Sequence, residues 1–294
     1  MNVRRTAAAV WAAALFCAAP AAAQGSDPNP GAITLSGGFD VLNAYHFRGI
    51  PQDEGRFGSL LWPYADLGIA LVERDGGLKT IGVNIGTWNS LHNSGAALGS
   101  DGPFAKLWYE SDFYATVGFG FGGGASVGVT YTAYTSPNGM FSTVREIAVK
   151  FAVDDSGYLG GAAVKPYVLV AREVAFGIGG SRIGSGAAQA DAGAALGTYM
   201  ELGAAPGFSG SRVGVSVPVK VGLSLDNYYE GASGDERFGF FSVAGVATVP
   251  LTSEPTRFGT WNVHGGVEYL RLGDRNQLFG EHQVIGSIGI GFSY

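Results

Sequence analysis

The sequence predicts an all-β fold, a closed antiparallel transmembrane β-barrel of about twelve strands, within a range of roughly ten to fourteen. Three observations lead to this prediction. The last residues, 283–294, alternate apolar and small side chains. Residues 1–23 form a short apolar leader. The whole chain has 49 glycines and only 14% charged residues, and after the leader it has no run of the roughly 18 apolar residues that a membrane helix needs.

The final segment, QVIGSIGIGFSY, reads as a strand with one apolar face. Ile288, Ile290, Phe292 and Tyr294 share one parity, and small or polar residues occupy the other. An apolar strand with a free edge invites aggregation in water, whereas a closed barrel in lipid pairs all its backbone groups. We therefore expect this strand to close the barrel. Phe292 and Tyr294 are then expected to form the signal that the barrel assembly machinery reads.

The leader has the three parts of a secretory signal peptide. Arg4 and Arg5 precede an apolar run, and small residues end it at Ala23. We expect cleavage near Ala23/Gln24, leaving residues 24–294 as one barrel domain. The predicted location is the outer membrane of a Gram-negative bacterium, with outer-membrane lipid around the barrel.

Composition excludes several classes of function. The single cysteine, Cys17, lies in the predicted signal peptide, so the mature chain has no disulfide, thiol chemistry or cysteine metal site. The net charge is −6 before the leader is removed, without basic runs, which argues against nucleic-acid binding. We expect no cofactor and no metal ion.

Period-2 alternation predicts the strands in order. The ninth is the clearest internal example, because valine or leucine occupies every second position from Val213 to Leu225. The first carries Ile33, Leu35 and Phe39 on one parity, and the fourth carries Phe113, Val117 and Phe119. The predicted strands are 32–48, 57–73, 78–89, 104–121, 124–135, 143–154, 162–173, 194–205, 211–226, 237–251, 258–271 and 283–294.

The connections alternate in length. ERDGGL, FGGG, DDSGYLG and APGFSGS are short, and the stretches near 91–103, 173–193, 226–237 and 272–282 are long. Outer-membrane barrels place short turns in the periplasm and longer loops outside. Aromatic residues are expected in two interfacial belts. The predicted outer belt is Tyr45, Phe47, Tyr109, Phe241 and Tyr269, and the inner belt is Phe119, Phe121, Trp261, Phe292 and Tyr294.

The inward parity carries the main functional prediction. It holds an excess of acids, including Asp40 and Glu201, over lysines such as Lys165. We expect a water-filled, mildly cation-preferring passage for small hydrophilic solutes or ions. A filled scaffold is the alternative, since a barrel of about this size holds water only if side chains leave room. The predicted pore-lining residues are Asp66, Lys106, Trp108, Glu110, Asp112, Tyr114, Glu146, Lys150, Lys220, His264 and Glu268.

Residues 43–71, NAYHFRGIPQDEGRFGSLLWPYADLGIAL, resemble the opening of the TorF-like family of outer-membrane porins. The resemblance is carried by Tyr45, Phe47, Arg48, Gly49 and Gln52. It covers about a tenth of the chain, and Tyr294 stands where the family more usually ends in phenylalanine. It implies an outer-membrane barrel with a transport role.

Two further hypotheses concern the proposed outer loops. Arg48, Arg237 and Arg271 would suit binding of lipopolysaccharide phosphates, because the guanidinium group forms paired hydrogen bonds. Ser90 and Ser94 flank His92, but no nucleophile motif surrounds them, so we expect no catalytic residues. Three classes remain open: a diffusion channel, a structural or surface-interaction barrel, and a barrel enzyme acting on lipid.

Overall fold

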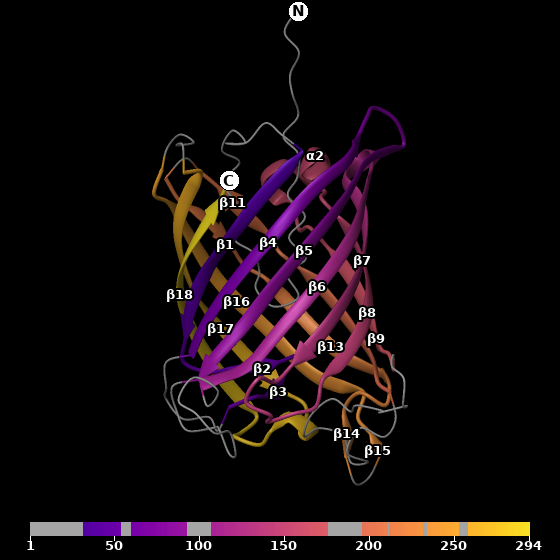
Figure 1. Cartoon of the computed structure of the whole chain (residues 1–294), viewed down its shortest axis with the longest axis vertical. Coiled ribbons are helices and arrows are strands. Elements are labelled where there is room, and N and C mark those ends of the chain that lie inside the picture. The colour runs from indigo at the N-terminus through magenta and orange to yellow at the C-terminus, as the bar shows by residue number, and fades with distance from the viewer. Residues whose placement is uncertain are drawn as a thin grey trace, which may run out of the picture.

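The computed structural model describes residues 32–53, 60–92, 107–175, 196–210, 212–231, 234–252 and 258–294. These residues form a closed antiparallel barrel of twelve strands (Figure 1), which confirms the predicted fold. The predicted signal peptide and Lys106 lie outside the described residues.

Each strand of the barrel pairs with its neighbour in the chain, and β1 with β18 closes the ring. The ninth predicted strand is divided: β12 (Gly214–Ser216) and β13 (Val219–Asp226) both pair with β16, and Pro218 lies between them. A short strand, β11 (Gly207–Ser209), pairs with β12. The other strands are β1 (Ile33–Leu42), β4 (Leu60–Glu73), β5 (Leu78–His92), β6 (Trp108–Phe121), β7 (Ala125–Thr135), β8 (Val144–Val153), β9 (Tyr167–Glu173), β10 (Thr198–Ala204), β16 (Phe238–Pro250), β17 (Thr260–Leu272) and β18 (His282–Ser293).

The two ends of the barrel differ in their connections. At one end, here called the turn end, lie η1 (Gly122–Gly124), α2 (Ser156–Leu159) and η2 (Gly160–Ala162). At the other, the loop end, lie β14 (Glu230–Gly231), β15 (Gly234–Asp235) and η3 (Asp274–Asn276). Figure 1 shows α2 at the upper end and β14 and β15 at the lower end. The strands that precede the longer predicted connections, β5, β9, β13 and β17, end at the loop end.

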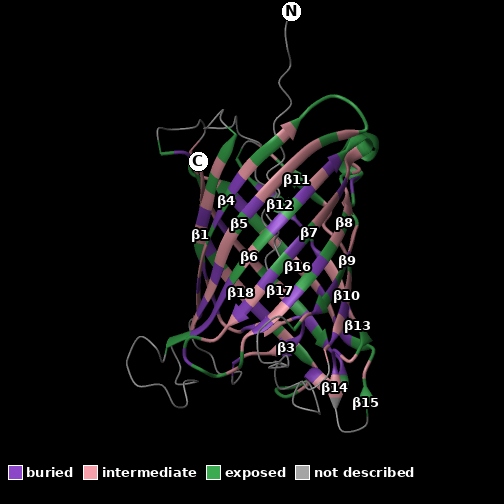
Figure 2. Ribbon diagram, turned by 45° about the vertical axis from the view of Figure 1, so that its right-hand side comes forward, coloured by how far each residue is buried: buried purple, intermediate pink, exposed green. Residues whose placement is uncertain are grey.

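Large apolar side chains cover the outside of the barrel. Figure 2 shows buried and exposed residues alternating along the strands, as a period of two requires. Phe113 and Val267 are each 58% exposed, and Ile288 is 60% exposed. A continuous apolar surface of this kind is stable against hydrocarbon rather than water. The outward parity predicted for these positions is therefore the observed one.

No helix among the described residues is long and apolar enough to cross a membrane.

The first strand is shorter than predicted. It ends at Leu42, and residues 43–53 turn into the barrel instead of continuing its wall. Tyr45 is fully buried and Phe47 packs against the buried core, so their assignment to an outer aromatic belt is wrong. The physical reason is hydrogen bonding inside the barrel. The Tyr45 hydroxyl donates to the buried carboxylate of Glu110, and the neighbouring Arg48 donates to that of Glu146.

A β-bulge near the loop end corrects two more predictions. Ser90 pairs with Glu110, but the next residue, Leu91, pairs with Trp108, so β6 has one extra residue there. A bulge of this kind changes which side chains face inward beyond it. Tyr109, expected outside, is 7% exposed, and Trp108, expected in the lumen, is 41% exposed.

Lys165 was also expected in the lumen, and this prediction is wrong. It lies in the turn between η2 and β9, where its backbone N–H donates to Asp155 Oδ1 at 2.9 Å. The same carboxylate accepts the N–H of Val164. These hydrogen bonds form a tight connection at the turn end, so Lys165 belongs to this connection and not to a strand that lines the lumen.

Candidate functional site

Residues 46–51 form a small hairpin inside the loop end of the barrel. β2 (His46–Phe47) pairs with β3 (Ile50–Pro51), and Arg48 and Gly49 form the turn. Both turn residues have positive φ, 50° and 82°, as a type I′ turn requires. Glycine is needed at position 49 for space as well, because a Cβ would lie 2.9 Å from Phe240 Cβ. Arg48 has no such freedom, so its conformation is strained.

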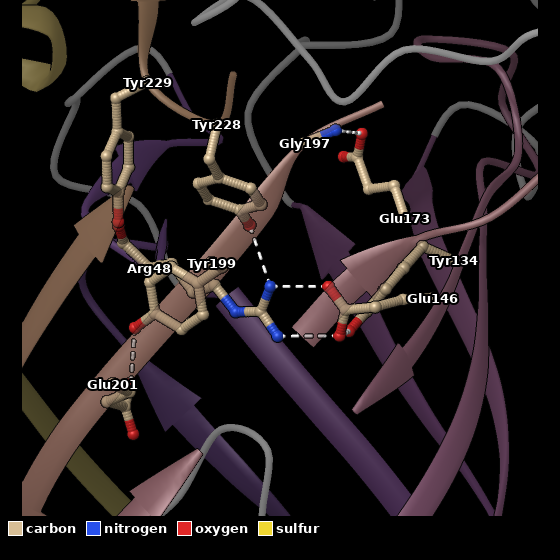
Figure 3. A network of polar contacts seen from close by, with 9 residues as sticks. All are labelled: Arg48, Tyr134, Glu146, Glu173, Gly197, Tyr199, Glu201, Tyr228 and Tyr229. Carbon is tan, nitrogen blue, oxygen red and sulfur yellow. Dashed lines mark hydrogen bonds and ion pairs between the residues drawn. The ribbon is translucent and has the colours of Figure 1, made fainter. Parts of the chain in front are cut away.

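The arginine of this turn is held by a buried carboxylate from the opposite wall. Arg48 Nη1 donates to Glu146 Oε2 at 2.6 Å, and Nη2 donates to Oε1 at 2.8 Å (Figure 3). Each side chain is 3% exposed. Paired charge-assisted hydrogen bonds of this geometry are among the strongest in proteins. Glu146 belongs to β8, 98 residues from Arg48 in the chain.

Tyrosines surround the guanidinium group. Its carbon lies 4.1 Å from the centre of the Tyr199 ring, and Nη1 also donates to the Tyr228 hydroxyl at 3.0 Å. The Tyr229 hydroxyl donates to the Arg48 carbonyl oxygen at 2.8 Å. Burial by itself lowers the pKa of Arg48, but the Glu146 carboxylate raises it, and the net pKa is well above its ordinary value. The arginine is therefore charged inside the barrel.

The rest of the inward segment, residues 43–53, reaches other parts of the wall. The Tyr45 hydroxyl donates to Glu110 Oε2 on β6 at 2.8 Å, and the Tyr109 hydroxyl donates to Gln52 Oε1 at 2.7 Å. Asn43 Nδ2 donates to the carbonyl oxygen of Val284 on β18, and Asn43 Oδ1 accepts the backbone N–H of Gly286 on the same strand. With the Glu146 contact on β8, the segment spans the barrel interior at the loop end.

The wall formed by β8, β10, β13 and β17 holds a second, more exposed set of charges. Lys220 Nζ lies 3.4 Å from Glu268 Oε1, and the two side chains are 25% and 26% exposed. Lys150 Nζ lies 4.2 Å from the centre of the Tyr167 ring. Glu201 accepts the Tyr167 hydroxyl at 2.6 Å and also binds Tyr199. The charged groups of this wall are held by tyrosines as much as by each other.

The opposite wall carries two polar clusters. His264 Nε2 lies 2.6 Å from Asp40 Oδ1, although β18 separates their strands, so the contact is made through the interior. Asp66 accepts the Asn84 amide at 2.7 Å and the Tyr114 hydroxyl at 3.1 Å. All these side chains belong to the barrel wall and meet within the lumen.

The structure places most of the predicted pore-lining residues inside the barrel. Trp108 faces the exterior instead, and Lys106 is not among the described residues. The residues whose side chains face the interior are Asp66, Glu110, Asp112, Tyr114, Glu146, Lys150, Lys220, His264 and Glu268.

The three arginines predicted to bind lipopolysaccharide do not share one environment. Arg48 is buried and paired, so its assignment to a lipid contact is wrong. Arg237 and Arg271 are exposed at the loop end, and Arg271 Nε donates to Glu281 Oε1 at 2.9 Å. Arg48 was expected to be exposed because it lies in a predicted loop, and arginines in loops are usually solvated.

The predicted terminal signal lies at the seam of the barrel. Phe292 pairs with Gly37 of β1 and packs on Trp261 with ring centres 5.3 Å apart. The backbone of Tyr294 exchanges two hydrogen bonds with Leu35. Both residues therefore help to join the last strand to the first.

Ser90 and His92 approach each other but do not form an accessible nucleophile site. Ser90 Oγ lies 2.9 Å from His92 Nε2, and Trp62 Nε1 donates to the same hydroxyl at 3.0 Å. Ser90 is fully buried, His92 is 2% exposed, and the imidazole stacks on Tyr109. Among the described residues no carboxylate hydrogen-bonds to His92, so a catalytic triad is not assembled.

The tyrosines around Arg48 were missed by the sequence analysis. Tyr228 and Tyr229 lie in a long loop that is otherwise acidic. Two adjacent aromatic residues in such a loop are the one sequence feature that could have indicated burial. Tyr199 belongs to a strand whose alternation is weak. Glu173, also missed, accepts the Gly197 N–H at 2.7 Å and joins the ends of β9 and β10. In the part of the chain that the structure covers, no group of acidic, histidine or cysteine residues is arranged to hold a metal ion.

Comparisons with known proteins return structures only. No protein-family model matches the chain, and no curated protein sequence matches it. The chain is similar to an outer membrane channel from Pseudomonas putida F1, with 10% identity, 90% of this chain and 97% of that chain covered, and a TM-score of 0.48. It is also similar to the NanC porin, with 12% identity, coverage of 89% and 99%, and a TM-score of 0.44. Outer membrane phospholipase A from Escherichia coli gives 9% identity, coverage of 88% and 92%, and a TM-score of 0.40. Similarity at this level supports no conclusion about activity.

Proposed function

We propose that the protein is an outer-membrane channel for the passive diffusion of small hydrophilic solutes or ions. The loop end faces the outside of the cell and the turn end faces the periplasm. One observation carries the proposal: charged and hydrogen-bonded side chains line the interior, while the exterior is apolar. Burying ionised groups in a dry core is costly. An interior with partly exposed pairs such as Lys220 and Glu268 favours a hydrated lumen.

The inward segment sets the narrowest part of this channel. It contacts β6, β8 and β18 at the loop end, whereas the side chains of the Lys220–Glu268 pair stay partly exposed in the lumen. The hairpin at residues 46–51 also contains Phe47, Arg48 and Gly49, three of the residues that resemble the TorF-like porins.

We also propose a mild preference for cations. Among the described residues, the interior holds more carboxylates than cationic side chains. Fixed charge attracts counter-ions, and salt screens it within about 10 Å at 0.1 M. The carboxylates are Asp40, Asp66, Glu110, Asp112, Glu146, Glu201 and Glu268, and the cationic side chains are Arg48, Lys150 and Lys220.

The test is a planar-bilayer recording of the purified barrel beside a variant in which a Gly-Ser linker replaces residues 45–51. Both should conduct, the variant with the larger single-channel conductance. Reversal potentials in a salt gradient should show cation preference that fades near molar salt. A correctly folded variant that never conducts would favour the filled, structural barrel. Anion preference would refute the proposed effect of the lumen charges.

Two contacts with the envelope belong to the same proposal. Arg237 and Arg271 would bind lipopolysaccharide phosphates, and Phe292 and Tyr294 would be read by the barrel assembly machinery. Exposure of both arginines at the loop end supports the first, and the place of the two aromatics in the closing strand pair supports the second. Replacing both arginines with glutamine should weaken co-purification of lipopolysaccharide while leaving the barrel folded.

A further inference from the structure

The hairpin inside the barrel contains a histidine in an unusual environment. Both ring nitrogens of His46 are buried, and neither has a hydrogen-bond partner among the described residues. His46 is the first residue of β2 and pairs with Pro51 across the hairpin. A buried imidazole without partners is stable only in its neutral form, because the charged form loses its hydration without compensation.

The charged groups near this imidazole do not stabilise its protonated form enough to offset the loss of hydration. Burial lowers the pKa of His46 to about 4, and the carboxylate of Glu268 on β17 opposes this effect in part. That carboxylate lies 3.4 Å from Lys220 Nζ of β13, so its charge is shared with a cation. On the hairpin itself, the nearby cation is Arg48, which is directed to Glu146 of β8.

The hairpin is also held in a way that permits a second position. Its turn places Arg48 at a φ of 50°, a left-handed conformation that strains a non-glycine residue. One bidentate ion pair, with Glu146, is its charged attachment to the wall. The hydroxyl of Tyr229, from a loop rather than a strand, covers the turn. Arg48 also donates to the Tyr228 hydroxyl and lies on the Tyr199 ring, so movement of the hairpin releases these contacts together with the ion pair and relieves the strain at Arg48.

We propose that the hairpin at residues 46–51 is a gate in the lumen, and that uptake of a proton by His46 opens it. The proposal rests on the channel function proposed above. In the closed position the imidazole is dry and neutral. In the open position it lies in water and can carry a proton, while Arg48 leaves Glu146.

The direction of the pH effect follows from the two positions of His46. An imidazole in water has a pKa of about 6.5, higher than that of the buried group. The closed state is therefore favoured above pH 6.5 and loses its advantage as the pH falls toward 4. Between pH 7.5 and pH 5.0 this linkage raises the ratio of open to closed channels by roughly 30-fold.

The first experiment measures open probability in planar bilayers at pH 7.5 and pH 5.0. The wild-type barrel should open more at pH 5.0, and His46→Gln should abolish most of the difference. His282→Gln is the matched control, because His282 has a side chain that is 57% exposed and lies outside the lumen. That variant should keep the wild-type response. Persistence of the response in His46→Gln, or its absence in a conducting wild-type barrel, would refute the proposal.

A second experiment follows the hairpin without relying on current. The chain has one cysteine, Cys17, in the predicted signal peptide, so Ile50→Cys introduces a single thiol. Ile50 is 4% exposed, and Leu278→Cys, at a position 72% exposed, corrects for the pH dependence of the reagent. Labelling of position 50 by a membrane-impermeant thiosulfonate, relative to position 278, should rise about tenfold or more at pH 5.0. The rise should disappear when His46→Gln is added.

The double variant Arg48→Gln with Glu146→Gln separates the two proposals. It removes the attachment of the hairpin and should conduct at both pH values. If it conducts but the wild-type barrel shows no pH response, the channel stands and the gate is refuted. If nothing conducts while position 50 still becomes accessible at pH 5.0, the hairpin moves as proposed and the channel function fails. Equal labelling of position 50 at both pH values refutes the moving hairpin in every case.

Discussion

The loop half and the turn half of the lumen are built from the same strands but from different side chains. Large rings fill the loop half: Tyr45, for example, lies 5.0 Å from Trp62 and 5.5 Å from Trp88, centre to centre. Toward the turn end the inward groups include small ones, such as Thr116 and Thr130, whose hydroxyls are 2.8 Å apart. Strand number fixes the diameter of both halves equally. The size of inward side chains and one inserted segment therefore decide which half is closed.

Two ion pairs of the interior also differ in exposure. Each side chain of the Arg48–Glu146 pair is 3% exposed, whereas Lys220 and Glu268 are about one quarter exposed. A buried pair is expensive to break because one charge is left without a partner, and an exposed pair is worth little because water and salt screen it. Equivalent substitutions should consequently have unequal effects at the two pairs.

The largest effect is expected from Glu146→Ala. Removing this carboxylate leaves a buried guanidinium group without its partner, which costs about 3–5 kcal/mol. A urea titration of the barrel in lipid vesicles measures the loss of stability. Arg48→Met with Glu146→Leu is the control, since replacing both charges by apolar groups should recover most of the stability. A loss below about 1 kcal/mol in the single variant would mean that the loop half is hydrated like the turn half.

A second prediction concerns the exterior, which the two halves share. Val149 is 46% exposed on β8, between Val129 and Val170 of the neighbouring strands. Val149→Arg should cost about 2–4 kcal/mol in lipid, because the charge faces hydrocarbon. Lys150→Arg, one residue away and inside the barrel, should change stability by less than about 1 kcal/mol. Equal costs in refolding titrations would show that the outside of the barrel does not face lipid.

The third prediction addresses packing in the turn half. A Cβ added at Gly203 would lie 2.3 Å from the Tyr167 ring, which rests against the backbone there. Gly203→Ala should displace the ring and cost about 1–3 kcal/mol. Gly245→Ala is the matched control, because a Cβ at that outward glycine meets nothing within 4 Å. If the two variants melt at the same temperature, Tyr167 is not held against the wall.

The smallest effect is expected from Glu268→Gln. Its pair with Lys220 is partly exposed, so the loss should be below about 1 kcal/mol and should vanish in high salt. The comparison with Glu146→Ala, measured by the same urea titration, expresses the contrast between the buried and the exposed ion pair as one ratio. A loss as large as that of Glu146→Ala would place Glu268 in a dry environment.

Local alternation was sufficient to predict the wall of the barrel. In β18 and β6 apolar residues at every second position predict which face of the strand points outward, so Ile288 and Phe113 were placed correctly on the exterior. Each such prediction depends on neighbouring residues only. The fold, the outward parity and most inward charges follow from that rule.

The inward segment could not be predicted by the same rule. Tyr45 and Phe47 keep the alternation of β1, and a strand that continues outward and a hairpin that turns inward look alike over so few residues. What distinguishes them is the partner of Arg48, which lies 98 residues away on β8. Trp108 was misplaced for a related reason, because a bulge of one residue leaves no mark on the local pattern.

The pairing of β1 with β18 has a consequence for how the chain reaches its folded state. Asp40 pairs with Gly289, so the closing contact joins residues that are farther apart in the chain than any other pair of adjacent strands. Contacts of such separation form slowly, because the loop between them must first be restricted. Until they form, both closing strands present unpaired backbone groups that could join other chains. A folding intermediate with eleven strand pairs made and the last one missing should therefore be the species most prone to aggregate, and the rate of closure should limit the yield of refolded barrel.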